Sequence, residues 1–237
     1  MTTTFPWDDL ELKRRESEAV ASIWTTRASL ANLQAQGGRR ADDSRGGRHL
    51  DAFAAMLGEL ARSAGFQEDE VRYRTGVEIP GFYRPTKRWD LVVVRNDQLC
   101  AAIEFKSMMG AYGKNLNNRS EEALGSATDV WAAFKEGTLG NRSPWLGYLF
   151  VIREEKESTT PVDIARSTPQ AEKIFTQSSY LDRYGILCAR MVRERLYSAA
   201  AYVASSGSKA DEWREPCAGL ELRTFAHSYY GHLIGWG

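Results

Sequence analysis

Residues 84–106 read RPTKRWDLVVVRNDQLCAAIEFK, in which two apolar runs flank a pair of turn residues. The first run, 89–94, is rich in β-branched side chains, and the second spans 99–105. Asn96 and Asp97 between them are typical of a tight turn, so the stretch predicts a β-hairpin. Both arms are apolar at consecutive positions, and we therefore expect helices to cover both faces of the sheet that contains them.

Three charged residues lie in this apolar hairpin: Asp90 in the first arm, and Glu104 and Lys106 near the end of the second. A buried charge needs a partner or a metal. Two carboxylates from neighbouring strands offer the hard oxygen ligands that Mg²⁺ prefers, and Lys106 points to the same side of its strand as Glu104. With a metal there, Lys106 would orient or deprotonate a water that hydrolyses a phosphodiester. A buried ion pair that only holds the sheet together explains the same residues, and spacing alone favours neither interpretation.

The shared site depends on strand register, because only residues directly opposite each other share a face of the sheet. A regular two-residue turn at 96–97 would set Asp90 opposite Ile103 and put Glu104 on the other face. An odd loop, or a β-bulge that shifts the count by one, would set Asp90 opposite Glu104. A metal site therefore requires one of these two irregularities.

The spacing Asp90-x13-Glu104-Phe105-Lys106 resembles the PD-(D/E)xK nuclease superfamily, with Trp89 where the motif has Pro. Short motifs of this kind recur by chance, so the flanking sequence carries more weight.

Three longer strings resemble the XhoI family of type II restriction endonucleases: IPGFYRPTKRWDLVVV at 79–94, AAIEFKS at 101–107 and NNRSEEALGSA at 117–127. The resemblance extends from about Ala19 into the C-terminal third and is strongest from Ile79 to Gly140.

This resemblance implies a Mg²⁺-dependent enzyme that hydrolyses double-stranded DNA at the palindrome CTCGAG with a staggered cut. Asp90 and Glu104 would bind the metal, the Phe105 backbone carbonyl would add a ligand, and Lys106 would position or activate the attacking water. A palindromic target favours a C₂ homodimer. The resemblance also implies a bacterial cytoplasmic location and a DNA methyltransferase as functional partner in a restriction-modification system.

Two alternatives stay open from the sequence. One keeps the fold and the metal chemistry but changes the substrate, as in a repair or junction-resolving nuclease. The other is a catalytically inactive DNA-binding module that keeps the basic loops.

We expect one α/β domain over residues 1–237, with a mixed central sheet flanked by helices as in the restriction-endonuclease core. Its expected parts are N-terminal helices at 7–65, a catalytic core at 70–153 and a C-terminal helical region at 178–237. Apolar periodicity predicts the helices, which lie at 7–36, at 50–64, from about 120, and at 179–205 with a break near Gly185. Strands are expected at 71–79 and 145–153, and a solvated loop at 154–160.

Composition adds limits. The 31 basic and 31 acidic residues balance, so any DNA contact must come from local basic clusters and not from a generally basic surface. Three widely spaced cysteines predict neither a disulfide framework nor a zinc site, and His227 and His232 are interpreted as structural. No cleavable signal and no membrane-spanning run is expected.

Basic residues cluster at two places before Asp90. Arg84, Lys87 and Arg88 follow Phe82 and Tyr83 and form a candidate phosphate clamp, although a basic surface loop with anchoring aromatics explains them equally well. The segment 37–49 has no apolar periodicity and is either a solvated linker or an arm that contacts DNA. Its arginines are Arg39, Arg40, Arg45 and Arg48.

A polar segment follows Lys106 and is expected to be a loop that leads into the helix near Ser120. Asn binds adenine bidentately and Arg binds guanine, so this segment is a candidate base reader. Helix capping and turn formation explain the same asparagines. The candidates are Lys114, Asn115, Asn117, Asn118 and Arg119, and Glu59 in the helix at 50–64 is carried as a further candidate acid.

Overall fold

The computed structural model describes residues 4–35, 48–207, 209 and 212–236. A six-stranded mixed sheet forms its centre, in the order β1-β4-β5-β6-β7-β8. The β4–β5 pair is antiparallel, whereas β5, β6 and β7 run parallel. The predicted α/β class with a mixed central sheet is therefore confirmed. The strands are β1 (Val71–Tyr73), β4 (Leu91–Arg95), β5 (Gln98–Met108), β6 (Trp145–Arg153), β7 (Ala199–Ser205) and β8 (Trp213–Arg214).

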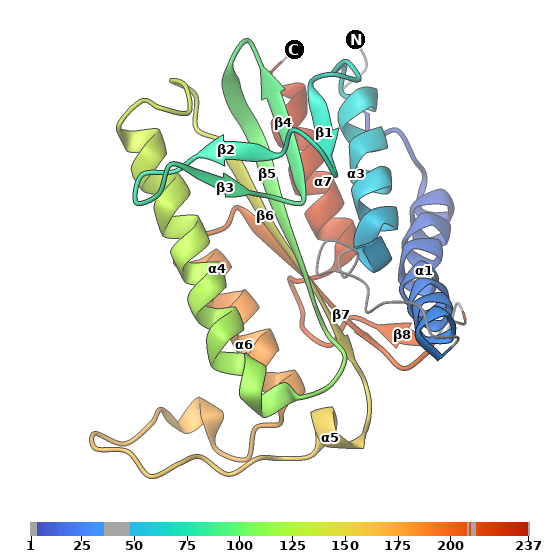
Figure 1. Cartoon of the computed structure of the whole chain (residues 1–237), viewed down its shortest axis with the longest axis vertical. Coiled ribbons are helices and arrows are strands. Elements are labelled where there is room, and N and C mark those ends of the chain that lie inside the picture. Colours follow the sequence, from blue (N-terminus) through green and yellow to red (C-terminus); the bar gives the residue numbers. More distant parts are fainter. Residues whose placement is uncertain (1–3, 36–47, 208, 210–211, 237) are drawn as a thin grey trace.

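Helices cover both faces of the sheet, as the unbroken apolar runs predicted (Figure 1). One face packs against α1 (Asp9–Ala35), α3 (Asp51–Ser63) and α7 (Leu222–Ile234). The other packs against α4 (Tyr112–Lys135) and α6 (Tyr180–Arg193), which connect the parallel strands β5 to β6 and β6 to β7. Parallel neighbours require such crossover helices, and two crossovers of the same hand put both helices on one face.

The β4–β5 hairpin forms as predicted, with a two-residue turn at 96–97 in which both residues have positive φ, 51° and 59°. The register then shifts. Val94 lies opposite Leu99, but Val93 lies opposite Ala101, so one residue of β5 has no partner on β4. This β-bulge changes the count along β5 by one.

The strand predicted at 71–79 is wrong as a single element. It splits into β1 and β2 (Glu78–Pro80) at a turn where Arg74 and Gly76 have φ of 69° and 65°. Residues with positive φ interrupt an extended strand. β2 pairs with β3 (Thr86–Arg88) in a separate hairpin that reaches from the sheet toward α4 (Figure 1).

The long helix predicted at 179–205 is also wrong in its second half. Helix α6 runs through Gly185 without a break and ends at Arg193, and 199–205 is the buried strand β7. Its sequence, AAAYVAS, has a helical propensity that pairing with β6 and β8 overrides. The C-terminal region 178–237 therefore contributes two strands as well as helices α6 and α7.

Two further boundaries differ from expectation. Helix α4 begins at Tyr112, eight residues before Ser120. The Tyr112 ring is fully buried, and its hydroxyl donates to Glu155 at 2.7 Å and lies 3.2 Å from the Arg153 carbonyl oxygen. The segment 154–160, expected as a loop, contains the short helix α5 (Lys156–Thr159). It begins at a reciprocal cap in which Glu155 and Ser158 bond each other's backbone.

The remaining described elements are the short 3₁₀ helices η1 (Arg48–Leu50) and η2 (Lys173–Phe175). All three cysteines are free. Among the helices in the described parts of the chain, none has the length and apolarity needed to cross a bilayer. His232 contacts the carbonyl of the bulge residue Cys100 at 3.1 Å, which agrees with a structural role for this histidine.

Candidate active site on the β4–β5 hairpin

The β-bulge brings Asp90 and Glu104 to the same face of the sheet. Leu91 lies opposite Ile103, so the preceding residue, Asp90, lies opposite Glu104. The Asp90 amide donates to the Ile103 carbonyl at 3.2 Å, and the Phe105 amide donates to Asp90 Oδ2 at 2.7 Å. The register condition for a shared site is therefore met by the bulge, not by the loop length.

Two lysines bind the two oxygens of Glu104. Lys106 Nζ lies 2.5 Å from Glu104 Oε1, and Lys87 Nζ donates to Glu104 Oε2. Glu104 is buried, with 6 % of its surface exposed, whereas Asp90 is exposed as a whole residue although protein atoms surround its carboxyl group. The site thus has a deep carboxylate held by two ammonium groups and a second carboxylate at its mouth.

These contacts set the charges of the site. The pKa of Asp90 is raised, first because protein atoms shield its carboxyl from water and second because the Glu104 carboxylate lies nearby. Burial alone would raise the pKa of Glu104, but Lys87 and Lys106 outweigh it and lower that pKa. Burial opposes the charge of Lys106, yet Glu104 and Asp90 raise its pKa, so Lys106 is protonated at neutral pH.

The donor set fits a divalent cation. Two carboxylates repel each other until positive charge lies between them, and here ammonium groups already neutralise both oxygens of Glu104. Within the described residues no group of three or more His, Cys, Asp or Glu side chains converges. Asp90 and Glu104 would hold a divalent cation together with backbone or water oxygens. The Phe105 carbonyl stays the predicted third ligand.

Lys87 does not lie together with Arg84 and Arg88, the two residues predicted to form a phosphate clamp with it. Lys87 points into the site with only 11 % of its side chain exposed, whereas Arg88 on the other side of β3 pairs with Glu78 at 2.7 Å. The alternation of side chains along β3 causes this separation. Lys87 lies 4.2 Å from the ring centroid of Trp89, the residue that replaces the motif's Pro.

Asp129 on α4 fixes the β2–β3 hairpin that carries Lys87, and sequence reasoning missed it. Its carboxylate accepts from the Phe82 and Tyr83 amides, both at 2.8 Å, and from Arg84 Nε at 2.7 Å. Asp129 is almost fully buried, at 1 % exposure. Gly81 allows this close approach, since a Cβ there would lie 2.7 Å from Asp129 Oδ2. Nothing local in the sequence marks a contact between residues more than forty positions apart.

Comparison with known proteins agrees with this geometry. The family model described as "Restriction endonuclease XhoI" matches residues 31–214. The chain is 39 % identical over 197 residues to the type II restriction enzyme BstVI of Geobacillus stearothermophilus, a match that covers 79 % of this chain and 88 % of BstVI.

The chain belongs to the XhoI family of type II restriction endonucleases, a class of site-specific deoxyribonucleases.

Two further relatives carry the same description. The type II restriction enzyme XhoI of Xanthomonas vasicola is 38 % identical over 192 residues, 78 % of this chain and 77 % of that enzyme. AbrI of Azospirillum brasilense is 37 % identical over 158 residues, 63 % of this chain and 69 % of that enzyme. No solved structure gives a significant match.

In this XhoI-family chain the predicted base readers lie on helix α4 and not in a loop. Lys114, Asn117 and Asn118 are exposed there. Asn115 donates to the Ala111 carbonyl at 3.1 Å, so it is the asparagine that bonds the backbone at the start of the helix.

Arg119 is joined to the candidate active site through Glu122, an acidic residue that was not among the predicted site residues. Arg119 bonds Glu122 at 2.7 Å, and Glu122 lies 3.8 Å from Lys106 Nζ. The i, i+3 spacing of Arg119 and Glu122 could have indicated their pairing once the helix was known to begin at Tyr112.

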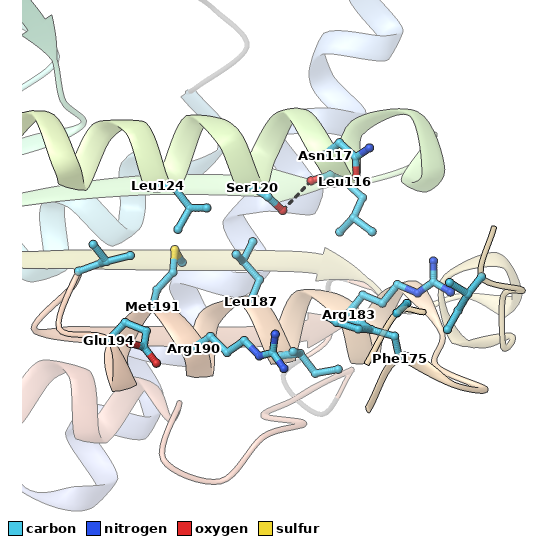
Figure 2. A pocket seen from close by; sticks show the side chains of 14 residues that line it. Leu116, Asn117, Ser120, Leu124, Phe175, Arg183, Leu187, Arg190, Met191 and Glu194 are labelled. Atoms are coloured by element: carbon cyan, nitrogen blue, oxygen red, sulfur yellow. Dashed lines mark hydrogen bonds between the residues drawn. The ribbon is translucent and has the colours of Figure 1, made fainter. Parts of the chain in front are cut away.

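A groove of about 420 Å³ lies between α4, α6 and the segment 164–175, and the side chains that line it are shown in Figure 2. Its lining is largely apolar, with Leu124, Leu187 and Met191 among the residues, and Asn117 lies beside Leu116 at one end. The groove includes none of Asp90, Glu104 and Lys106. It is therefore separate from the candidate active site.

Of the other candidates, three lie outside the described residues and one, Glu59, lies on the opposite face of the sheet. Arg39, Arg40 and Arg45 are not among the described residues, and Arg48 begins η1. Glu59 lies on α3, which packs against the opposite face of the sheet, and pairs with Arg15 at 2.6 Å. The structure therefore does not bring Glu59 to the site.

Proposed function

We propose that this protein is a Mg²⁺-dependent restriction endonuclease that hydrolyses both strands of double-stranded DNA at CTCGAG. The observation that carries the proposal is the placement of Asp90 opposite Glu104 by the β-bulge, with Lys106 bonded to Glu104 on the same face. Membership in the XhoI family supports the substrate class. The target sequence rests on that membership alone.

Each residue has a distinct task in this proposal. Asp90 and Glu104 would hold the cation, and Asp90 is the more exposed residue of the two. When bound, Mg²⁺ stabilises the negative charge that develops on the phosphate during hydrolysis. Lys106, protonated and fixed by Glu104, donates a hydrogen bond that orients the attacking water or a phosphate oxygen. The Phe105 amide holds the Asp90 carboxylate at the correct side of the strand.

A plasmid digest tests the proposal. A plasmid with one CTCGAG site should become linear in Mg²⁺, remain intact in EDTA, and remain intact in Mg²⁺ when one base pair of the site is changed. Nicking limited to branched or damaged DNA would favour a repair or junction-resolving nuclease. Binding without any cutting would favour an inactive DNA-binding module.

The DNA-contact candidates predict two classes of variant. Arg84→Ala and Arg88→Ala should weaken binding about equally on cognate and random DNA, each lowering the salt slope by about one unit, because phosphate contacts carry no sequence information. Asn117→Ala and Asn118→Ala should cost roughly 1–3 kcal/mol on cognate DNA and far less on random DNA, because they remove base contacts. Fluorescence anisotropy in Ca²⁺ measures both. Equal losses on the two DNAs would assign the start of α4 to positioning.

A palindromic target also predicts a C₂ homodimer, since two identical active sites then reach equivalent bonds on the two strands. Sedimentation of the free protein at micromolar concentration and of its DNA complex should show two chains. A monomeric complex that nicks each strand independently would contradict this assembly. In this proposal the enzyme acts in the bacterial cytoplasm, where a DNA methyltransferase of the same restriction-modification system protects the host's own sites.

A further inference from the structure

Lys87 lies in the active site although it belongs to a different hairpin from Asp90 and Glu104. Its ammonium donates to Glu104 Oε2 and to the Arg88 carbonyl at 3.1 Å. Lys106 already binds the other oxygen of Glu104. Both oxygens of the buried carboxylate are thus occupied by side chains of the protein itself.

The residues around Lys87 favour a positive charge at the position of its ammonium group. The ammonium lies 4.2 Å from the ring centroid of Trp89, and Trp89 is 1 % exposed. The face of an indole ring attracts cations. Trp89 is the residue by which this chain departs from the PD-(D/E)xK pattern, and its ring supports a second lysine that the pattern does not include.

We infer that Lys87 is a counter-ion of Glu104 in the metal-free protein and that a divalent ion displaces it from this carboxylate. The released ammonium group of Lys87 then binds a DNA phosphate. The inference rests on the metal site of the proposed function. A divalent ion that takes Glu104 as a ligand must compete with an ammonium group for the same oxygen. Lys87 is therefore a positioning residue for Glu104 in the metal-free protein and a phosphate ligand in the loaded one, so it couples metal binding to DNA binding.

Displacement of Lys87 by a divalent ion is tested by measuring cation affinity. The metal-stripped full-length protein is titrated calorimetrically with Ca²⁺ in the absence of DNA. Lys87→Met keeps an unbranched apolar side chain over Trp89 and removes the charge, so it should raise Ca²⁺ affinity roughly tenfold or more, because a positive charge no longer opposes the ion at short range. Lys87→Arg should stay near the wild-type affinity. Lys135→Met is the matched control, because it removes an equal charge from the exposed last turn of α4.

The outcomes separate the inference from the proposed function. Equal Ca²⁺ affinities for Lys87→Met and wild type, both abolished by Glu104→Gln, would overturn the inference and leave the metal site intact. Absence of any Glu104-dependent binding in either protein would overturn the metal site, and the inference with it. A binding signal that is measurable only in Lys87→Met would support both. Unfolding midpoints identify any variant whose fold is disturbed.

Binding of the released Lys87 to a DNA phosphate is tested by fluorescence anisotropy. The affinity for a short CTCGAG duplex is measured over a range of salt concentrations. In Ca²⁺ the Lys87→Met salt slope should be lower than that of wild type by about one unit, because one phosphate contact is lost. In EDTA the two slopes should agree, since Glu104 then holds Lys87. An identical decrease in both conditions would overturn release by the metal and make Lys87 an unconditional phosphate ligand.

Discussion

Glu104→Gln and Lys106→Met should each slow DNA cleavage in Mg²⁺ by on the order of 10²–10⁴-fold. Glu104 is the deep carboxylate of the proposed metal site, and its Oε1 lies 2.5 Å from Lys106 Nζ. Loss of either residue therefore removes a metal ligand or the group that orients the reacting water. Single-turnover cleavage of a CTCGAG duplex measures the change.

Specific binding in Ca²⁺ separates a loss of chemistry from a loss of folding. Ca²⁺ occupies oxygen sites with flexible geometry, so Lys106→Met should bind cognate DNA in Ca²⁺ nearly as well as wild type. Glu157→Gln removes a comparable carboxylate from the exposed surface of α5 and should cut at the wild-type rate. If Lys106→Met also cuts at that rate, the assignment of this site is wrong.

The hairpin and the strand at 145–153 were predictable because their physical signal is local. Each is a consecutive run of apolar residues, and a strand covered on both faces requires this pattern. The same pattern made Asp90, Glu104 and Lys106 candidates, since a charge in an apolar run needs a partner or a metal. Their catalytic roles stay a prediction. The bulge could be predicted only as a requirement for a shared Asp90–Glu104 site, and not as a feature at a known position. Turn residues at 96–97 indicate a two-residue turn, and no residue type in β5 marks the position of the shift.

The errors arose where distant contacts decide local structure. Helix α4 begins early because Tyr112 is anchored by Arg153 and Glu155, which are 41 and 43 residues further along the chain. Strand β7 forms from an alanine-rich segment because β6 and β8 pair with it. The pairing of Lys87 with Glu104 could not be predicted for a related reason, because it depends on how the β2–β3 hairpin lies over the sheet.

Asp129→Ala should lower the free energy of unfolding by roughly 2–4 kcal/mol and should also weaken cleavage. The change leaves the Phe82 and Tyr83 amides and the Arg84 guanidinium without the buried carboxylate that binds all three. The hairpin would detach from α4, and Lys87 and the entry into Asp90 would lose their fixed position. Urea denaturation measures the stability, and trypsin cleavage after Lys87 or Arg88 measures the detachment.

Two variants and one pH series test the physical cause. Thr128→Ala changes the exposed neighbour of Asp129, loses only a bond to the Leu124 carbonyl, and should behave as wild type. Asp129→Asn keeps an acceptor for the amides but loses the charge that pairs with Arg84, so its free energy of unfolding should lie between those of wild type and Asp129→Ala.

Burial opposes ionisation of Asp129, but the Tyr83 and Phe82 amides and Arg84 outweigh it and lower its pKa. Because the folded-state pKa lies below the unfolded one, the stability difference between wild type and Asp129→Ala should be complete at neutral pH. It should shrink only as the pH falls below the ordinary aspartate range, about 3.9. A difference that stays constant through that range would mean that packing, and not the carboxylate charge, holds the hairpin to α4.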